Sequence, residues 1–301
     1  MYIIVPKNIT LVSSNVAEET SYPVWDSSTT YNKDDIVLVQ NLQPNGITKI
    51  FKSLADNNTG NYPPENPGKW QDLGATNKWK MFDNYVTSQT VNENEIDVVV
   101  TGISGADSIC LFRIYAGRCY IKITDENDNT VIEKDISLLQ NTSSCWSDYF
   151  FGDIILRDSL KVSIPFTASS WKIEIKLYNS PTVKCGHVII GKSKNLGCTL
   201  FGVNAGILDY SKKETNDFGE TYLKQGKWAK KAELDVEVKN ELIDQVQRTL
   251  ADLRATPVVW DLNNEKTDYT SLLIYGFYRD FSIVLSNPVV SQCSITVEGL
   301  I

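Results

Sequence analysis

The chain has 301 residues, of which 42% are hydrophobic and 22% charged, so it is long enough for two or three domains and too apolar for a disordered chain. Its formal net charge is −8, and its largest basic cluster is the short KWAKK segment at 227–231. This balance argues against nucleic acid and anionic membranes as partners, because both require a basic surface.

The apolar runs are only a handful of residues long, so we expect no insertion into a membrane. The N-terminal MYIIVPKN has no basic region before its apolar residues, which argues against a secretory signal. The six cysteines lie far apart, mostly within apolar runs, and form no CxxC pair. We therefore expect buried, reduced thiols in a protein made in the cytoplasm, and the spacing supports no particular disulfide.

Residues 22–74 are rich in Asn, Pro and Asp and contain few apolar runs beyond DIVLVQ and KIFKSL. This composition indicates a small β module with long loops, which we place at residues 1–75. Its aromatic residues follow the order Trp-x5-Tyr-x3-Asp-x-Val, then KIFKSLADNNTG, then the Pro-rich YPPENPGKW. The residues that carry this pattern are Trp25, Tyr31, Phe51 and Trp70.

The pattern resembles the chitin-binding type (family 5/12) of carbohydrate-binding module. Asp34 stands where that family has Gly, and Phe51 where it usually has Tyr. The resemblance implies that the four aromatic residues bind sugar, with Trp70 as the exposed ring that stacks on it. The alternative is that Trp25, Tyr31 and Phe51 are the core of a small module. The sequence leaves both interpretations open.

The segment ATNKWKMFDNYVTSQT at 75–90 carries large apolar residues at a spacing that fits neither a helix nor an alternating strand. We expect Trp79, Met81 and Phe82 to pack between the small module and the next domain and to fix the angle between them. An ordinary first strand of that next domain is the alternative.

Residues 76–184 contain short runs rich in β-branched and aromatic residues, such as IDVVVTG, RCYIKITD and WKIEIKLY, separated by turn residues. This pattern predicts a central antiparallel β-sandwich of the jelly-roll type. DENDN at 125–129 predicts a hairpin loop. It also imitates the start of a calcium loop, but Thr130 and Ile136 replace the Gly and Glu that such a loop needs, so we expect no metal site.

Residues 185–301 predict a β-rich C-terminal domain with one long helix at about 237–254. Apolar residues there recur at helical spacing, and Pro257 ends the pattern. The residues on this apolar face are Val238, Leu242, Val246, Leu250 and Leu253. The fold class is therefore mainly β.

Catalytic signatures are missing from the sequence. GHVIIGKS at 186–193 matches the phosphate-loop letters, but HVII favours a strand and no helix follows, so we interpret it as a strand that ends in a Gly turn. The single histidine, His187, lies in an apolar run and fits a core position. We expect no catalytic residue, no cofactor and no enzymatic activity.

The segments TNKWKMFD, GCTLFGVNAG, DYSKKETNDFGETYLKQG, TPVVWDL and YGFYRDFSIVLS resemble tail proteins of tailed bacteriophages and prophages. The resemblance implies a virion component of the tail tip or baseplate. Its partners would be other tail proteins and receptor-binding fibres, and it would form a homo-oligomer around the tail axis.

Two other functions remain open from the sequence. One is a lectin-like adhesion protein that binds a host surface glycan through the N-terminal module. The other is a polysaccharide-degrading enzyme with an accessory binding module, which the missing catalytic signatures disfavour.

Overall fold

A computed structural model describes residues 1–83, 88–140, 146–151, 155–215, 218–263, 269–285 and 287–300. The chain is mainly β, as predicted. It divides into two compact units, Lys7–Ile190 and a second made of Met1–Pro6 with Gly191–Ile301. We call them the N-terminal unit and the C-terminal unit. The boundary between them falls inside strand β14 (His187–Asn195).

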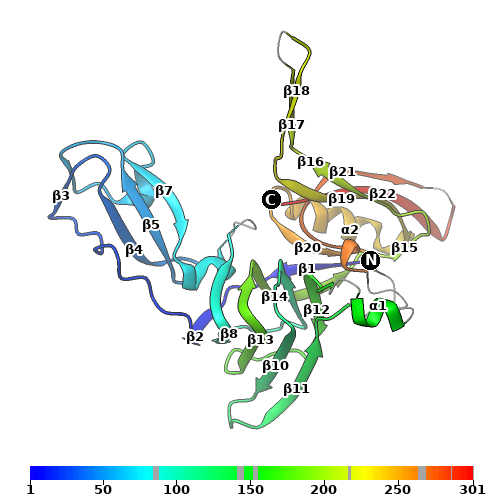
Figure 1. Cartoon of the computed structure of the whole chain (residues 1–301). Coiled ribbons are helices and arrows are strands. Elements are labelled where there is room, and N and C mark those ends of the chain that lie inside the picture. The colour runs from blue at the N-terminus through cyan, green and yellow to red at the C-terminus, as the bar shows by residue number, and fades with distance from the viewer. Residues whose placement is uncertain are drawn as a thin grey trace. The chain divides into compact units, whose positions relative to one another are not determined.

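The N-terminal unit begins with a small module built on a three-stranded antiparallel sheet in the order β4-β5-β7, drawn in blue and cyan in Figure 1. Its strands are β4 (Ile36–Leu42), β5 (Ile47–Ser53) and β7 (Trp70–Ala75). A second pair, β3 (Thr30–Tyr31) and β6 (Asn58–Thr59), lies in the loops, and a 3-10 helix spans Pro63–Glu65. The module has a hydrophobic core of its own: Tyr31, Val37, Val39, Phe51 and Trp70.

The segment after β7 forms a 3-10 helix, Asn77–Phe82. Trp79, Met81 and Phe82 are buried in a cluster that also contains Ile47 and Ala75 of the small module and many residues of the following sandwich. Residues 77–82 therefore do not form the first strand of the sandwich. Residues 84–87 lie outside the described residues, and the next strand is β8 (Thr90–Thr101).

The central part of the N-terminal unit is a sandwich. One sheet is five-stranded in the order β11-β10-β13-β8-β2; beside it, β12 pairs with β9 and β9 with β14. Alternate residues of β10 are buried, and buried side chains of both sheets fall in one hydrophobic cluster. The remaining bounds are β2 (Thr10–Ser14), β9 (Ser108–Phe112), β10 (Arg118–Thr124), β11 (Thr130–Ser137), β12 (Ser159–Ser163) and β13 (Lys172–Cys185).

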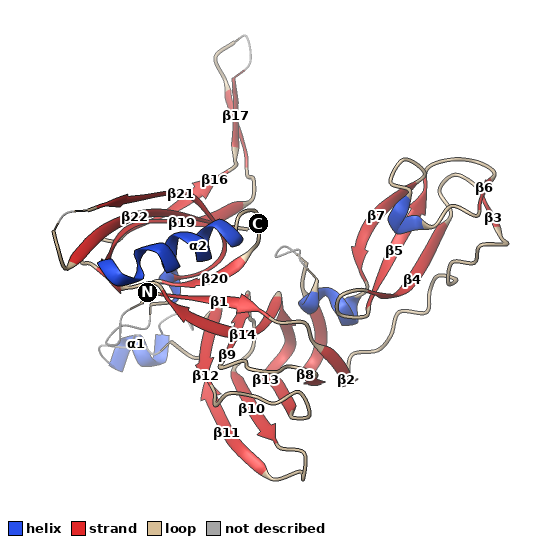
Figure 2. Cartoon of the chain, turned by 180° about the vertical axis from the view of Figure 1, so that it is seen from behind, coloured by secondary structure: helices blue, strands red, loops and turns tan. Residues whose placement is uncertain are grey.

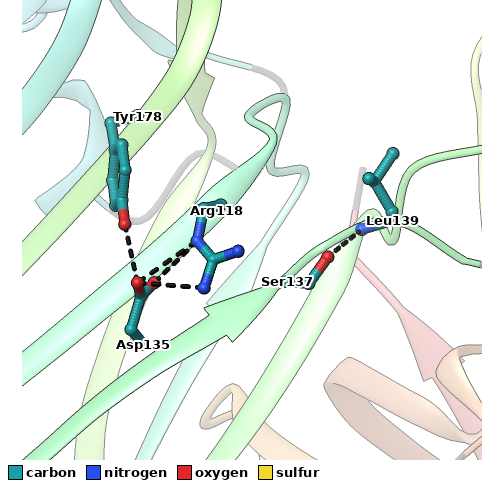
Figure 3. Close-up of polar contacts among 5 residues, drawn as sticks. All are labelled: Arg118, Asp135, Ser137, Leu139 and Tyr178. Atoms are coloured by element: carbon teal, nitrogen blue, oxygen red, sulfur yellow. Dashed lines mark hydrogen bonds and ion pairs between the residues drawn. The ribbon is translucent and has the colours of Figure 1, made fainter.

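Polar side chains link neighbouring strands on the solvent-facing side of the five-stranded sheet (Figure 3). Arg118 donates to both carboxylate oxygens of Asp135, at 3.0 and 3.2 Å, and the Tyr178 hydroxyl donates to the same carboxylate at 2.9 Å. The guanidinium lowers the pKa of Asp135. At the end of β11, the backbone N–H of Leu139 donates to the Ser137 hydroxyl at 3.3 Å.

The predicted hairpin loop at 125–129 is confirmed. It joins β10 to β11, and the Asp125 carboxylate accepts hydrogen bonds from the backbone N–H of Asn127 at 2.8 Å and of Asn129 at 2.9 Å. The backbone bonds close the turn inside the loop itself. The pKa of Asp125 is lowered first by the side-chain amide of Asn129, which donates to the carboxylate at 3.0 Å, and then by the backbone N–H of Asn129.

The C-terminal unit is one large antiparallel sheet with a helix on one face (Figure 2). The strand order is β14-β1-β20-β21-β22-β19-β15, and β16 also pairs with β19. The bounds are β1 (Tyr2–Pro6), β15 (Cys198–Thr199), β16 (Asn204–Asp209), β19 (Trp228–Lys239), β20 (Val258–Asp261), β21 (Leu273–Val284) and β22 (Val290–Gly299). Residues 1–6 thus belong to this unit and not to the first domain, where we expected them.

Helix α2 (Ile243–Asp252) covers the sheet with Val246 and Leu250, which pack on buried residues of β19 and β22. Tyr278 donates its hydroxyl to the carbonyl of Leu250 at 2.9 Å and so ties β21 to the helix. A 3-10 turn, Asn240–Leu242, precedes α2, and a second one, Thr270–Leu272, precedes β21. In the described part of the chain, no helix has the length and apolar character needed to span a membrane.

The predicted helix at 237–254 is too long, because the chain up to Lys239 belongs to β19. Val236 and Val238 alternate with exposed Glu237 and Lys239, and β19 pairs with β22 over this stretch. The apolar residue at 238 falls on the helical spacing by coincidence, and sheet pairing decides its structure. A second helix that we did not predict, α1, spans Trp146–Phe151.

Candidate assembly surface

One exposed feature of the C-terminal unit is a two-stranded hairpin made of β17 (Lys212–Thr215) and β18 (Thr221–Lys224), which we call the arm. Figure 1 shows it extending away from the sheet, and the view from behind in Figure 2 agrees. Every residue of both strands is exposed. Phe218 near the tip is 91% exposed and Leu223 is 79% exposed. Exposed apolar side chains are found at many protein contact surfaces, which makes the arm a candidate for one.

The base of the arm is held by close backbone contacts. The N–H of Tyr210 donates to the carbonyl of Lys227 at 3.0 Å, and the N–H of Gly226 donates to the hydroxyl of Ser211 at 2.9 Å. A Cβ atom at Gly226 would lie 2.3 Å from the carbonyl oxygen of Tyr210, so a glycine is required there. Asp209 accepts from the backbone and hydroxyl of Ser211, and these bonds lower its pKa. These contacts at its base fix the direction in which the arm leaves the sheet.

The pairing register gives the arm two different faces. Directly opposite residues in an antiparallel pair share a face, so Lys212 and Lys224 lie side by side on one face, next to the pair Glu214 and Tyr222. Like charges in this position repel each other. Neither lysine has an ion-pair partner among the residues that the structure describes. The arm thus presents two adjacent cationic groups to its surroundings.

The second feature is the sheet face opposite α2, which we call the outer face. The register places Glu233, Thr296 and Asp280 in one row across β19, β22 and β21, because Thr296 pairs with both acidic residues. Asp235, Ser294 and Ser282 form the next row. These residues alternate with the buried ones that pack on α2, so both rows point away from the helix.

The outer face is hollowed by a cavity of about 480 Å³ whose lining includes both rows. Its lining residues carry the carboxylates of Glu233, Asp235 and Asp280 and no cationic side chain. Lys231, outside the lining, forms an ion pair with Glu233 at 2.6 Å and lowers its pKa. The Asp235 carboxylate accepts a neutral hydrogen bond from the Ser294 hydroxyl at 2.5 Å and has no ion-pair partner in the part of the chain that the structure describes. Asp280 is exposed and has no ion-pair partner in the described residues.

Within the described ranges, the three carboxylates of the outer face do not form a metal-binding cluster. Among the residues that the structure describes, no set of three or more His, Cys, Asp or Glu side chains is arranged to hold a metal ion. The outer face carries negative charge, with serine and threonine hydroxyls beside the carboxylates. A cationic partner surface fits this chemistry best.

The structure also places the four aromatic residues of the small module. Trp70 is 2% exposed, and its indole N–H donates to the carbonyl of Asn61 at 2.9 Å. Tyr31 and Phe51 are buried beside it. The expectation that Trp70 is an exposed stacking ring is therefore wrong, because a module this small uses its largest ring as core.

Trp25 is the exception among the four. It is half-buried, and its ring meets that of Tyr62 at a centroid distance of 5.2 Å and an angle of 62°. Its Nε1 atom is buried and has no hydrogen-bond partner in the described residues. Tyr62, also half-buried, was not among the predicted site residues, although it opens the Pro-rich YPPENPGKW segment.

His187 and four of the five described cysteines are buried. His187 is 5% exposed, and burial lowers its pKa to about 4. Strand β14 runs through the whole GHVIIGKS segment beyond its first residue, so the predicted strand is present but does not end at Gly191. Of the five cysteines described, Cys198 is exposed, contrary to our expectation, and Cys145 lies outside the described residues. The other four are buried: Cys110, Cys119, Cys185 and Cys293.

No protein-family model matches the chain, and no curated protein matches it significantly. Among solved structures, it is similar to a mutant of the lectin binding domain of lectinolysin complexed with Lewis b. The similarity has a TM-score of 0.26 at 12% sequence identity and covers 38% of this chain and 83% of that chain. At this TM-score the similarity supports no conclusion about fold or ligand.

Proposed function

We propose that the chain is a structural component of a tailed bacteriophage, located at the tail tip or baseplate of the virion. It works in several copies around the tail axis, and it holds neighbouring tail proteins and receptor-binding fibres. The observation that carries this proposal is the arm, whose exposed Phe218 and Leu223 are suited to a partner protein.

Two further points support assembly over catalysis. The segments that resemble phage tail proteins lie mostly in the C-terminal unit, which also carries the arm and the outer face. A protein that repeats in three or more copies around an axis needs two different contact surfaces, one for each neighbour. The arm and the outer face are two such surfaces on one unit.

The proposal is tested on purified particles of the phage or induced prophage that encodes the chain. Quantitative mass spectrometry is expected to find the chain in the particle, at several copies relative to a tail protein of known copy number. Cross-linking mass spectrometry is expected to join it to other tail-tip or baseplate proteins. Particles that assemble fully and lack the chain would contradict the proposal.

Sugar binding by the small module is a second candidate function, favoured by the half-buried pair Trp25 and Tyr62. The face of a partly exposed aromatic ring can stack on the apolar face of a sugar ring. A glycan array with the full chain tests this, with Trp25→Ala as the variant and Phe150→Ala, on α1, as an exposed aromatic control. Binding that survives Trp25→Ala, or no binding at all, would count against this candidate.

A further inference from the structure

We infer that the arm of one copy docks on the outer face of a second copy of this chain. The inference rests on the proposed function, because it assumes a protein that works in several copies, and it adds which surfaces join those copies. The occupant of the cavity on the outer face is then the β17–β18 hairpin of a neighbour.

Charge complementarity points to this occupant. The arm places Lys212 and Lys224 side by side without an ion-pair partner in the described chain. The outer face offers Asp235 and Asp280, which likewise have no ion-pair partner there. The two surfaces thus leave opposite charges unpaired within one copy, and a second copy pairs them.

The chemistry around these charges also matches. On the arm, Tyr222 shares the face of the two lysines, since it pairs with Glu214 next to them. Its hydroxyl donates to Glu220 at 3.0 Å and can still accept a hydrogen bond. On the outer face, Thr296, Ser294 and Ser282 lie between and beside the carboxylates and supply hydroxyls for hydrogen bonds. An extended hairpin laid across the hydroxyl rows can use its tyrosine and its lysine ammonium groups together.

The arm does not fill the cavity of its own copy. The cavity lining contains residues of β16, β19, β21 and β22 and none of the arm among the residues described. Figure 1 shows the arm extending away from the sheet that carries the outer face. In the heterologous form of this contact, which a protein repeated around an axis uses, each copy gives an arm to one neighbour and receives an arm from the other. Such contacts close into a ring or continue as a filament.

Charge reversal tests the inference on the full chain. The arm variant is Lys212→Glu with Lys224→Glu, and the face variant is Asp235→Lys with Asp280→Lys. The control is Lys194→Glu with Arg248→Glu, two exposed basic residues of the C-terminal unit that lie outside the arm and the outer face. Sedimentation velocity over a concentration series measures self-association. Circular dichroism checks that each variant is folded.

We expect the wild type to self-associate, and more weakly as salt rises. The arm variant and the face variant each weaken self-association at least about tenfold, while the control leaves it unchanged. Mixing the arm variant with the face variant restores association, because each now carries the surface that the other needs. Restoration in the mixture also shows that neither variant has simply misfolded.

If both charge-reversal variants self-associate as strongly as the wild type, the inference is wrong, and the proposed function is unaffected. A wild type that is monomeric at every concentration would overturn the inference too. The proposed function is judged separately, by the presence of the chain in virions, so the two failures can be told apart.

Discussion

Tyr31 and Trp70 lie edge to face in the small module, with ring centroids 5.3 Å apart and ring planes at 69°. Trp70 starts β7 and Tyr31 ends β3, so this one contact joins the three-stranded sheet to the loop region that carries β3 and β6. The indole N–H is bonded to the carbonyl of Asn61 in the same loops. The module therefore depends on Trp70 for its core.

Trp70→Ala is expected to loosen the small module by about 3–5 kcal/mol, the usual cost of removing a large aromatic ring from a core. Hydrogen–deuterium exchange of the full chain measures this as lost protection in β4, β5 and β7, with the C-terminal unit unaffected. Trp70→Phe keeps a ring and loses the N–H bond to Asn61, so it should cost less. Unchanged protection in Trp70→Ala would contradict the core assignment.

Gly276→Ala is expected to destabilise the C-terminal unit by at least about 1–3 kcal/mol. A Cβ atom there would lie 2.0 Å from the backbone carbonyl oxygen of Glu298, so β21 and β22 must separate. Gly206→Ala in β16 is the matched control, since nothing lies within 4 Å of its Cβ position. Thermal unfolding measures both variants. Equal melting temperatures for the two would show that the pairing of β21 with β22 is wrong.

His187 makes the stability of the protein depend on pH, because burial lowers its pKa from 6.5 to about 4. The native state keeps the imidazole neutral, whereas the unfolded chain takes up a proton as the pH falls below 6.5. The contribution to stability is therefore complete above pH 6.5 and is lost as the pH falls toward 4. The loss between pH 7.5 and 4.5 is roughly 2–3 kcal/mol.

Urea unfolding of the wild type and His187→Leu at these two pH values isolates the effect, since the chain has one histidine. The variant lacks this group, so its free energy of unfolding should fall less than that of the wild type over the same interval. Carboxylates titrate in both proteins and cancel in the comparison. If both proteins lose the same free energy, His187 is not buried in its neutral form.

Cys198 is expected to react with iodoacetamide in the native protein, because it is exposed. Burial raises the pKa of the Cys119 thiol to about 12, so almost no thiolate is present there at neutral pH. Burial raises the pKa of Cys185 as well. Peptide mapping should find Cys198 labelled well before either of them. Faster labelling of Cys119 than of Cys198 would contradict the arrangement of β10 in the core.

Local signals in the sequence were sufficient where a few neighbouring residues decide the structure. The loop at 125–129 could be predicted because Asp125 bonds to residues two and four positions further along the chain. The mainly β fold could be predicted from the alternation and β-branched content of the runs themselves.

Long-range pairing decided the features that could not be predicted. Val238 fits a helical spacing in the sequence, but β19 pairs with β22, which lies more than fifty positions later. Strand β1 pairs with β14 near residue 191, at a separation that no local pattern reveals. Trp70 was expected to be exposed because the resemblance to a carbohydrate module suggested a stacking ring, and only the packing of the module shows it as core.

The outer face could not be predicted from the sequence either, because long-range strand pairing forms it. Glu233 and Asp280 are close in space because both pair with Thr296, and nothing near either residue in the sequence announces this. The arm segment DYSKKETNDFGETYLKQG stood out by its resemblance to tail proteins, while the position of Lys212 opposite Lys224 required the hairpin register.

An intermolecular disulfide tests the docking of the arm on the outer face most directly. Lys224→Cys and Asp280→Cys are made as separate variants in a Cys198→Ser background, which removes the exposed thiol. The two proteins are mixed and oxidised under mild conditions, with Lys194→Cys mixed with Asp280→Cys as the control. We expect a disulfide-linked dimer joining residues 224 and 280 in the first mixture, well above the control. Cross-linking no greater than in the control would contradict the docking.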